Sequence, residues 1–137
     1  MSDVRDPRSP APRVLVVEDD PDTRLLLVAA LAEEGYEPIP ALDGHHALRT
    51  AVAMGPEAIV LDLMLPETDG AEFVREYQEH VRSAKDTPIV VVSARHDAYE
   101  VAKSIGAVAC IAKPFEVGQL LERLGRAIDN ARSKAAT

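Results

Sequence analysis

The stretch VLVVEDDPDTR, residues 14–24, decides the fold prediction, because a continuous apolar run passes directly into three acidic residues. Val14–Val17 do not alternate with polar residues, which is typical of a strand that is covered on both faces. Asp20 followed by Pro21 is typical of a helix start, with an N-cap residue and a proline at the first helical position. The stretch therefore predicts a buried strand, an acidic turn and a helix in succession.

The same succession recurs along the rest of the chain. Further strands are predicted at residues 36–41, 58–61, 89–92 and 108–111, of which the first contains polar residues and the last is weakly apolar. Helices are predicted at about residues 21–34, 43–54, 70–82, 98–104 and 116–131. Strands that alternate with helices require a parallel sheet with right-handed crossovers. The predicted fold class is α/β, a doubly wound sandwich of three layers.

The length of 137 residues suits one domain, and 47% hydrophobic residues are enough to build a core. Residues 1–12 contain prolines among charged and small residues, and we predict a flexible lead-in there. Residues 13–131 form the predicted domain, and residues 132–137 a polar tail that is too short to hold an output domain.

Charge and composition narrow the expected partners and location. The net charge of −8 disfavours direct nucleic-acid binding and a polybasic membrane anchor, since both need clustered Lys and Arg. Cys110 is the only cysteine, so an intrachain disulfide is impossible. The N-terminal residues lack the apolar segment of a signal peptide, and the longest apolar run, Leu25–Ala32, is too short to span a membrane. We expect a cytoplasmic protein with no membrane partner.

Polar residues follow the predicted strands where each strand ends. They are Glu18, Asp19 and Asp20 after the first strand, Asp62 after the third, Ser93 after the fourth, and Lys113 with Pro114 after the fifth. A single Asp or Ser in such a place is more often a cap or turn residue. However, the carboxyl ends of parallel strands meet at one edge of the sheet, where ligands bind. Acids on two strands, with a hydroxyl and a lysine on others, favour a functional site.

This set of residues suits phosphoryl chemistry with a divalent cation. Carboxylate oxygens suit Mg²⁺, and zinc is disfavoured because no His or Cys follows these strands. Crowded acids raise one another's pKa values unless a cation is present, so we expect Asp19 and Asp20 to hold one. Asp62 is then a candidate nucleophile toward a phosphoryl group. Lys113 would neutralise the phosphoryl oxygens, and Ser93 would donate a hydrogen bond to one of them.

Taken together, four segments of the chain resemble the receiver domain of two-component response regulators. They are VLVVEDDPDTR, IVLDLMLPETDG, IVVVSAR and GAVACIAKPF, and they occur in this order. The resemblance covers about residues 13–131. It implies a flavodoxin-like fold, in which five helices flank a sheet of five parallel strands in the order 2-1-3-4-5.

The resemblance also implies a role for each matching residue. These roles are an acidic pair at Asp19 and Asp20, the phosphoacceptor at Asp62, a switch hydroxyl at Ser93 and the lysine at Lys113. It further implies that the backbone carbonyl of Met64 completes the Mg²⁺ site, with Mn²⁺ as a substitute, and that the peptide bond before Pro114 is cis.

Receivers of this family take a phosphoryl group from a phosphohistidine on a sensor kinase or a phosphotransfer protein. They hydrolyse the resulting acyl phosphate themselves, so we expect no enzymatic activity beyond the protein's own phosphorylation and dephosphorylation. Phosphorylation shifts an existing equilibrium and remodels the face made by the fourth helix, the fifth strand and the fifth helix. The expected output is protein–protein contact.

Three positions distinguish this chain from many receivers. Cys110 stands where many have Tyr or Phe, and we predict a small buried filler rather than a redox group. A thiol has no ring to rotate, so our hypothesis is a switch that works through movement of the fourth helix and its loop. Met64 and Arg95 stand where side chains line the path of the hydrolytic water in such proteins. An apolar Met cannot orient that water and Arg95 can screen the phosphate, so we predict slow self-hydrolysis.

Other functions fit the sequence less well. A receiver-like module that binds its partner without phosphorylation would be favoured by loss of a site residue, and only Cys110 points that way. A phosphatase of the haloacid dehalogenase type needs a second Asp two residues after the nucleophile, where this chain has Met64. A flavodoxin-like electron carrier needs a hydroxyl-rich phosphate loop where this chain has acids. A stand-alone receiver and a module cut from a larger regulator remain equally open.

Overall fold

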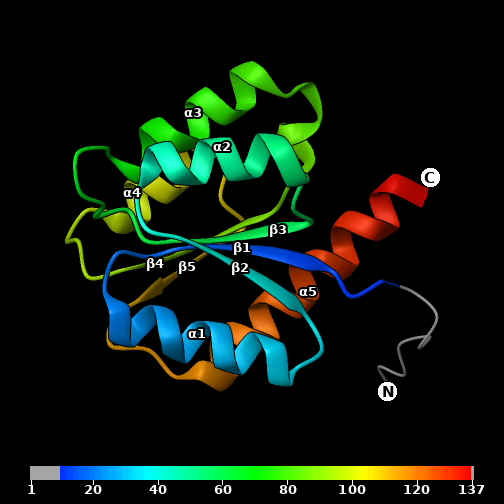
Figure 1. The fold of residues 1–137 in the computed structure, drawn as a ribbon, viewed down its shortest axis with the longest axis horizontal. Coiled ribbons are helices and arrows are strands. Elements are labelled where there is room, and N and C mark those ends of the chain that lie inside the picture. The colour runs from blue at the N-terminus through cyan, green and yellow to red at the C-terminus, as the bar shows by residue number, and fades with distance from the viewer. Residues whose placement is uncertain (1–9, 137) are drawn as a thin grey trace.

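The computed structural model describes residues 10–136 as a parallel sheet between two layers of helices (Figure 1). The strands are β1 (Arg13–Val17), β2 (Glu37–Ala41), β3 (Ala58–Leu61), β4 (Ile89–Ser93) and β5 (Ala109–Ala112). The helices are α1 (Pro21–Glu33), α2 (Gly44–Met54), α3 (Gly70–His80), the 3₁₀ helix η1 (Arg82–Asp86), α4 (Ala98–Ser104) and α5 (Val117–Ala136). The strands pair in parallel in the order β2-β1-β3-β4-β5, which confirms the predicted fold.

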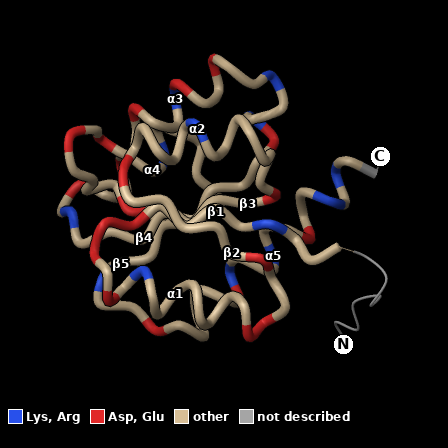
Figure 2. Tube along the Cα trace, viewed as in Figure 1, with Lys and Arg blue, Asp and Glu red and all other residues tan. Residues whose placement is uncertain are grey.

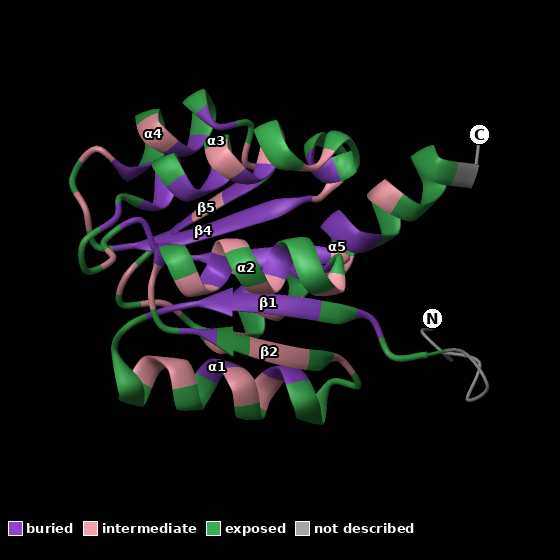
Figure 3. Cartoon of the chain, turned by 45° about the horizontal axis from the view of Figure 1, so that its top comes forward, coloured by how far each residue is buried: buried purple, intermediate pink, exposed green. Residues whose placement is uncertain are grey.

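The two faces of the sheet bury different residues of the same strands. Leu15 and Val17 of β1 join the core under α2, α3 and α4, whereas Val14 and Val16 join the core under α1 and α5. All four residues are at most 1% exposed, and Figure 3 shows β1 as buried over this stretch. Burial on both faces is the reason that β1 is apolar throughout instead of alternating.

Edge strand β2 tolerates two prolines because of the direction in which its N–H groups point. The N–H of Glu37 donates to the carbonyl of Pro12, so alternate residues of β2 donate toward β1. Pro38 and Pro40 occupy the positions between, where an N–H would point to the free edge of the sheet. The edge thereby lacks donors that another strand could use.

Aspartate side chains begin the first three α-helices. Asp20 accepts a hydrogen bond from the N–H of Thr23 at α1, Asp43 caps α2 in the same way, and Asp69 caps α3. Gly35 follows α1 with a φ of 94°, a left-handed conformation that glycine adopts without strain. The predicted starts of α1 and α2 and the predicted end of α1 are confirmed.

The structure corrects the predicted C-terminal tail. Residues 132–136 continue α5, and the Arg132 guanidinium makes two hydrogen bonds to the Glu57 carboxylate, at 2.8 and 2.9 Å. This contact with the loop before β3 holds a polar end of the helix against the domain. Of the predicted lead-in, residues 1–9 lie outside the described residues, while Pro12 is buried beside β2. Within residues 10–136, no helix is long and apolar enough to cross a membrane.

Candidate functional site

Three acidic side chains meet at the carboxyl edge of the sheet. Carboxylate oxygens of Glu18, Asp19 and Asp62 all lie within 4.8 Å of one another. Glu18 and Asp19 follow β1, and Asp62 follows β3, its neighbour in the sheet. The N–H of Asp62 donates to the carbonyl of Val17 at 3.0 Å, so the strand pairing itself brings the acids together. Figure 2 shows Asp and Glu positions gathered along the loops at this edge.

The structure corrects the predicted pairing of Asp19 with Asp20. The carboxylate of Asp20 accepts hydrogen bonds from the Thr23 N–H, at 2.9 Å, and from the Thr23 hydroxyl, at 2.6 Å. It is thereby directed at the start of α1 rather than at Asp62. Glu18 takes its place in the acidic cluster and is 1% exposed. In the sequence, Asp20 followed by Pro21 already indicates a helix N-cap, which uses the Asp20 carboxylate. This signal could have identified Glu18 as the partner of Asp19.

Lys113 follows the edge strand β5 and forms ion pairs with both buried acids. Its Nζ donates to Glu18 Oε1 at 2.7 Å and to Asp62 Oδ2 at 2.9 Å. At an effective dielectric constant of about 20, two carboxylates about 5 Å apart repel by roughly 3 kcal/mol. Glu18 and Asp62 are both buried, so the ammonium group between them offsets a repulsion that water screens poorly.

The pKa values of this ion-paired group reflect burial and pairing together. Burial raises the pKa of Glu18, although the hydrogen bond from Lys113 opposes that change. Partial burial alone would lower the pKa of Lys113, but hydrogen bonds to Glu18 and Asp62 outweigh it and raise that pKa. Lys113 is therefore positively charged at neutral pH.

The chemistry of the donor set fits a hard divalent cation. Within residues 10–136, the exposed Asp19 carboxylate makes no hydrogen bond or ion pair, although it lies beside two other carboxylates. Oxygen-rich sites of this kind suit Mg²⁺ and Mn²⁺ better than zinc. Glu18, Asp19 and Asp62 could therefore hold such an ion. The predicted contribution of the Met64 carbonyl stays a prediction; the Met64 N–H donates to Asp62 Oδ1 at 3.0 Å.

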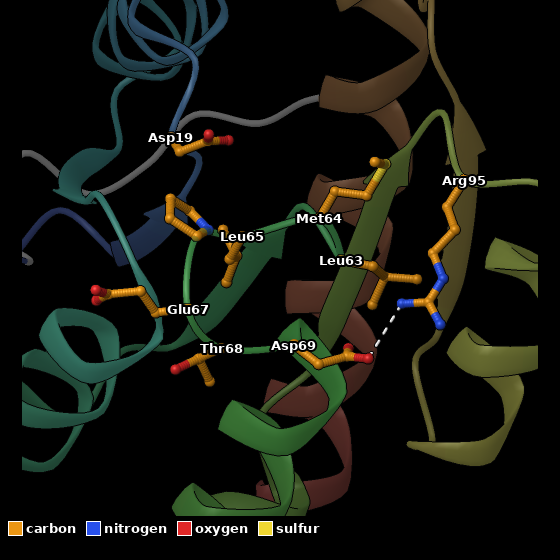
Figure 4. Close-up of a pocket in the computed structure, with 9 residues that line it drawn as sticks. Asp19, Leu63, Met64, Leu65, Glu67, Thr68, Asp69 and Arg95 are labelled. Atoms are coloured by element: carbon orange, nitrogen blue, oxygen red, sulfur yellow. Dashed lines mark hydrogen bonds and ion pairs between the residues drawn. The ribbon is translucent and has the colours of Figure 1, made fainter.

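A shallow hollow opens beside the acidic cluster. It is lined by Asp19, residues 63–69 and Arg95 (Figure 4). Met64 is 56% exposed at this hollow and presents an apolar side chain next to the acids. The position of Met64 is compatible with its predicted effect on phosphoryl lifetime, and that effect stays a prediction.

Ser93 ends β4, the strand next to β3, and Arg95 lies in the loop that follows. Ser93 is buried at the end of β4, and its hydroxyl oxygen accepts a hydrogen bond from the Arg95 N–H at 3.2 Å. The Arg95 guanidinium pairs with Asp97 at 2.6 Å and with Asp69 at 3.2 Å, and Figure 4 shows it directed toward Asp69. These pairings raise the pKa of Arg95, and the hydrogen bond from Arg95 lowers the pKa of Asp97. Sequence reasoning missed both acidic partners.

The remaining predicted positions lie on and after β5. Cys110 is half-buried against the core under α2, α3 and α4, and burial raises the pKa of its thiol. A protonated, packed thiol supports the prediction of a filler over that of a redox group. The peptide bond between Lys113 and Pro114 is cis, as predicted.

Comparison with known families gives one clear match. A family described as the response regulator receiver domain matches residues 14–125, which include every residue of the acidic cluster and Lys113.

Curated proteins of similar sequence are regulators. The transcriptional regulatory protein PrrA of Mycobacterium tuberculosis is 36% identical over 129 residues, which is 93% of this chain and 54% of that protein. The transcriptional regulatory protein PdtaR of the same species is 34% identical over 127 residues, 90% of this chain and 60% of that protein. The chain thus spans little more than half the length of these relatives.

Solved structures of similar fold include chains that this one covers almost completely and chains that it covers only in part. The chemotaxis protein CheY4 of Vibrio cholerae aligns with a TM-score of 0.79 and 30% identity, covering 85% of this chain and 98% of that one. NtrX of Brucella abortus aligns with a TM-score of 0.81 and 30% identity, covering 92% of this chain and 29% of that one.

Proposed function

This chain belongs to the response regulator receiver domain family of two-component signalling, and from that premise we propose that it is switched by phosphorylation of Asp62. The phosphoryl group comes from a phosphohistidine on a sensor histidine kinase or a histidine phosphotransfer protein, the two kinds of protein with which receiver domains of response regulators interact. The observation that carries the proposal is Lys113, which bonds the buried carboxylates of Asp62 and Glu18 at once.

Each residue of the site has a distinct part in the proposed transfer. A carboxylate oxygen of Asp62 attacks phosphorus, the bond between phosphorus and the histidine nitrogen breaks, and the imidazole leaves with the electron pair. The Lys113 ammonium neutralises a phosphoryl oxygen and the Ser93 hydroxyl donates to another. Water later hydrolyses the acyl phosphate, and the chain catalyses no reaction on other substrates.

Glu18, Asp19 and Asp62, with the Met64 carbonyl, would hold Mg²⁺ or Mn²⁺ in this proposal. Such a cation, when bound, supplies positive charge to the phosphoryl oxygens. Asp19 supports the assignment, because its carboxylate is exposed and free of protein partners within the described residues.

The proposed output is a contact with another protein through the face of α4, β5 and α5. In this proposal, phosphorylation disrupts the resting arrangement around Ser93 and Arg95 and thereby moves α4. No aromatic switch residue takes part, because Cys110 occupies that position. We propose slow self-hydrolysis, since Met64 cannot orient water and Arg95 lies at the same hollow. Response regulators generally act in the cytoplasm, which we propose as the location of this one.

Intact-protein mass after incubation with acetyl phosphate and Mg²⁺ tests the proposed function. The wild-type protein should gain one phosphoryl group, and Asp62→Asn should gain none. Asp69→Asn is the matched control, because it makes the same chemical change at the same hollow and should still be phosphorylated. Absence of both phosphorylation and Mg²⁺ binding in the wild type would instead favour a module that binds its partner without phosphorylation.

A further inference from the structure

We infer that Arg24 is a positioning residue that holds the acidic turn after β1 in the geometry needed to bind a divalent cation. The inference rests on the proposed function and adds a residue outside the acidic cluster. Arg24 lies in the first turn of α1, with its guanidinium folded back toward the end of β1.

One side-chain nitrogen of Arg24 donates hydrogen bonds to the backbone of both Glu18 and Asp19. Nη1 donates to the carbonyl oxygen of Glu18 at 3.0 Å and to that of Asp19 at 3.1 Å. The N–H of Arg24 donates to the carbonyl of Asp20 at 2.9 Å. A single residue therefore binds three successive carbonyls, which fixes the path of the chain between β1 and α1.

Asp19 depends on this contact more than Glu18 does. Glu18 is also held by the hydrogen bond from its own N–H to the Ala41 carbonyl, and its carboxylate accepts hydrogen bonds from the Asp20 N–H and from Lys113 Nζ. Within residues 10–136, by contrast, the bond from Arg24 is the one hydrogen bond that Asp19 makes. The Asp19 carboxylate is repelled by two neighbouring carboxylates, so an unanchored turn would let it move away from the site.

The charge of Arg24 makes the sign of the expected effect informative. A guanidinium near a cation site opposes the cation by Coulomb repulsion. Its removal would therefore tighten Mg²⁺ binding if charge were its only influence. If Arg24 acts by holding the turn, its removal weakens Mg²⁺ binding despite that gain.

Calorimetric titration of the unphosphorylated 137-residue chain with Mg²⁺ separates these alternatives. We expect Arg24→Gln and Arg24→Lys each to bind Mg²⁺ about tenfold more weakly than wild type, the scale seen for residues that orient metal ligands. Arg13→Gln is the matched control, because Arg13 also donates to a backbone carbonyl but lies at the other end of β1, and its affinity should not fall. Binding by Arg24→Gln that equals or exceeds wild type would overturn the inference.

A second measurement needs no metal. The N–H of Asp20 donates to Glu18 Oε2, so the hydrogen-exchange rate of this N–H reports on the order of the turn. We expect the exchange to be several-fold faster in both Arg24 variants than in wild type. The rate should be unchanged in Arg13→Gln. Unchanged exchange in the Arg24 variants would contradict the positioning role.

Phosphorylation by acetyl phosphate gives a third readout. In the Arg24 variants, the Mg²⁺ concentration for half-maximal phosphorylation should be higher than in wild type, while the rate at saturating Mg²⁺ should be the same. A wild type that neither binds Mg²⁺ nor accepts phosphate would refute the proposed function, whereas the exchange experiment would still test Arg24.

Discussion

Asp20 and Glu18 are chemically similar side chains two residues apart, and the structure gives them different tasks. Asp20 caps α1 through Thr23, while Glu18 is buried beside Lys113 and Asp62. The cap contributes to stability, whereas the buried acid belongs to the candidate metal site. The two residues can therefore be separated by experiment, because one should affect folding and the other cation binding.

Asp20→Ala should lower the melting temperature by about 4 °C, as expected for the loss of one N-cap in a chain of this size. Mg²⁺ affinity should stay within about twofold of wild type, since Asp20 is outside the acidic cluster. Thermal unfolding and Mg²⁺ titration check the two parts. Asp22→Ala is the control, because Asp22 lies in the same helical turn without the capping role. A large loss of Mg²⁺ affinity in Asp20→Ala would restore Asp20 as a ligand.

The same cap has a predictable dependence on pH. Hydrogen bonds from Thr23 lower the pKa of Asp20 in the folded protein. The contribution of the cap is therefore fully present above the unfolded pKa of about 3.9 and is lost as pH falls through the lower folded value. The difference in melting temperature between wild type and Asp20→Ala should be constant from neutral pH to about pH 5 and shrink below about pH 4. A difference that grew on acidification would contradict this sign.

At the scale of elements, Arg95 joins the loop after β4 to the start of α3. Its guanidinium bonds Asp97, next to α4, and Asp69, the N-cap of α3. The Arg95 and Asp97 side chains are 29% and 35% exposed, so their pairing is screened by solvent and contributes little to global stability. It contributes more to the local order of the loop between Ser93 and α4.

Asp97→Asn should therefore increase hydrogen exchange at residues 94–98 several-fold and leave the urea midpoint of unfolding nearly unchanged. High salt should reduce the difference between the variant and wild type, because exposed ion pairs are screened. Glu122→Gln is the control, since it breaks the exposed pair with Arg126 on α5, far from this loop in the sequence. Loop exchange equal to that of wild type would indicate that Arg95 does not order the loop.

At the scale of the whole molecule, α5 is held against the domain in its first half and again near its C-terminal end. Leu120 and Leu124 are buried in the core under α1 and α5, and Arg132 reaches Glu57 at the far end of the helix. Figure 3 shows exposed positions along the last turns of α5, and the ion pair is one contact that holds this part of the helix.

Arg132→Ala should lower the free energy of unfolding by about 0.5 kcal/mol, since the pair is bidentate but half exposed. Urea denaturation measures this change. Arg126→Ala is the control, because its pair with Glu122 is longer, at 3.7 Å, and more exposed, and it should have a smaller effect. Equal effects of the two substitutions would remove the assigned role of the Glu57 contact.

The sequence by itself determined the fold and most of the candidate site. Apolar runs such as Val14–Val17 can be buried on both faces only in a covered parallel sheet, and this topology places strand ends at one edge. Asp62 and Lys113 could be assigned from their places after strands alone. Local rules of this kind work because they depend on neighbouring residues and on the pairing of regular strands.

Only the tertiary structure decided which basic groups hold the acidic cluster and the end of α5. The contact between Lys113 and Glu18 joins residues 95 apart in sequence, and that between Arg132 and Glu57 joins residues 75 apart. Arg24 is near the acids in sequence, yet its bonds to Glu18 and Asp19 depend on how the helix turns back against the strand. Such contacts follow from the packing of whole elements and the direction of long side chains, which no local sequence pattern specifies.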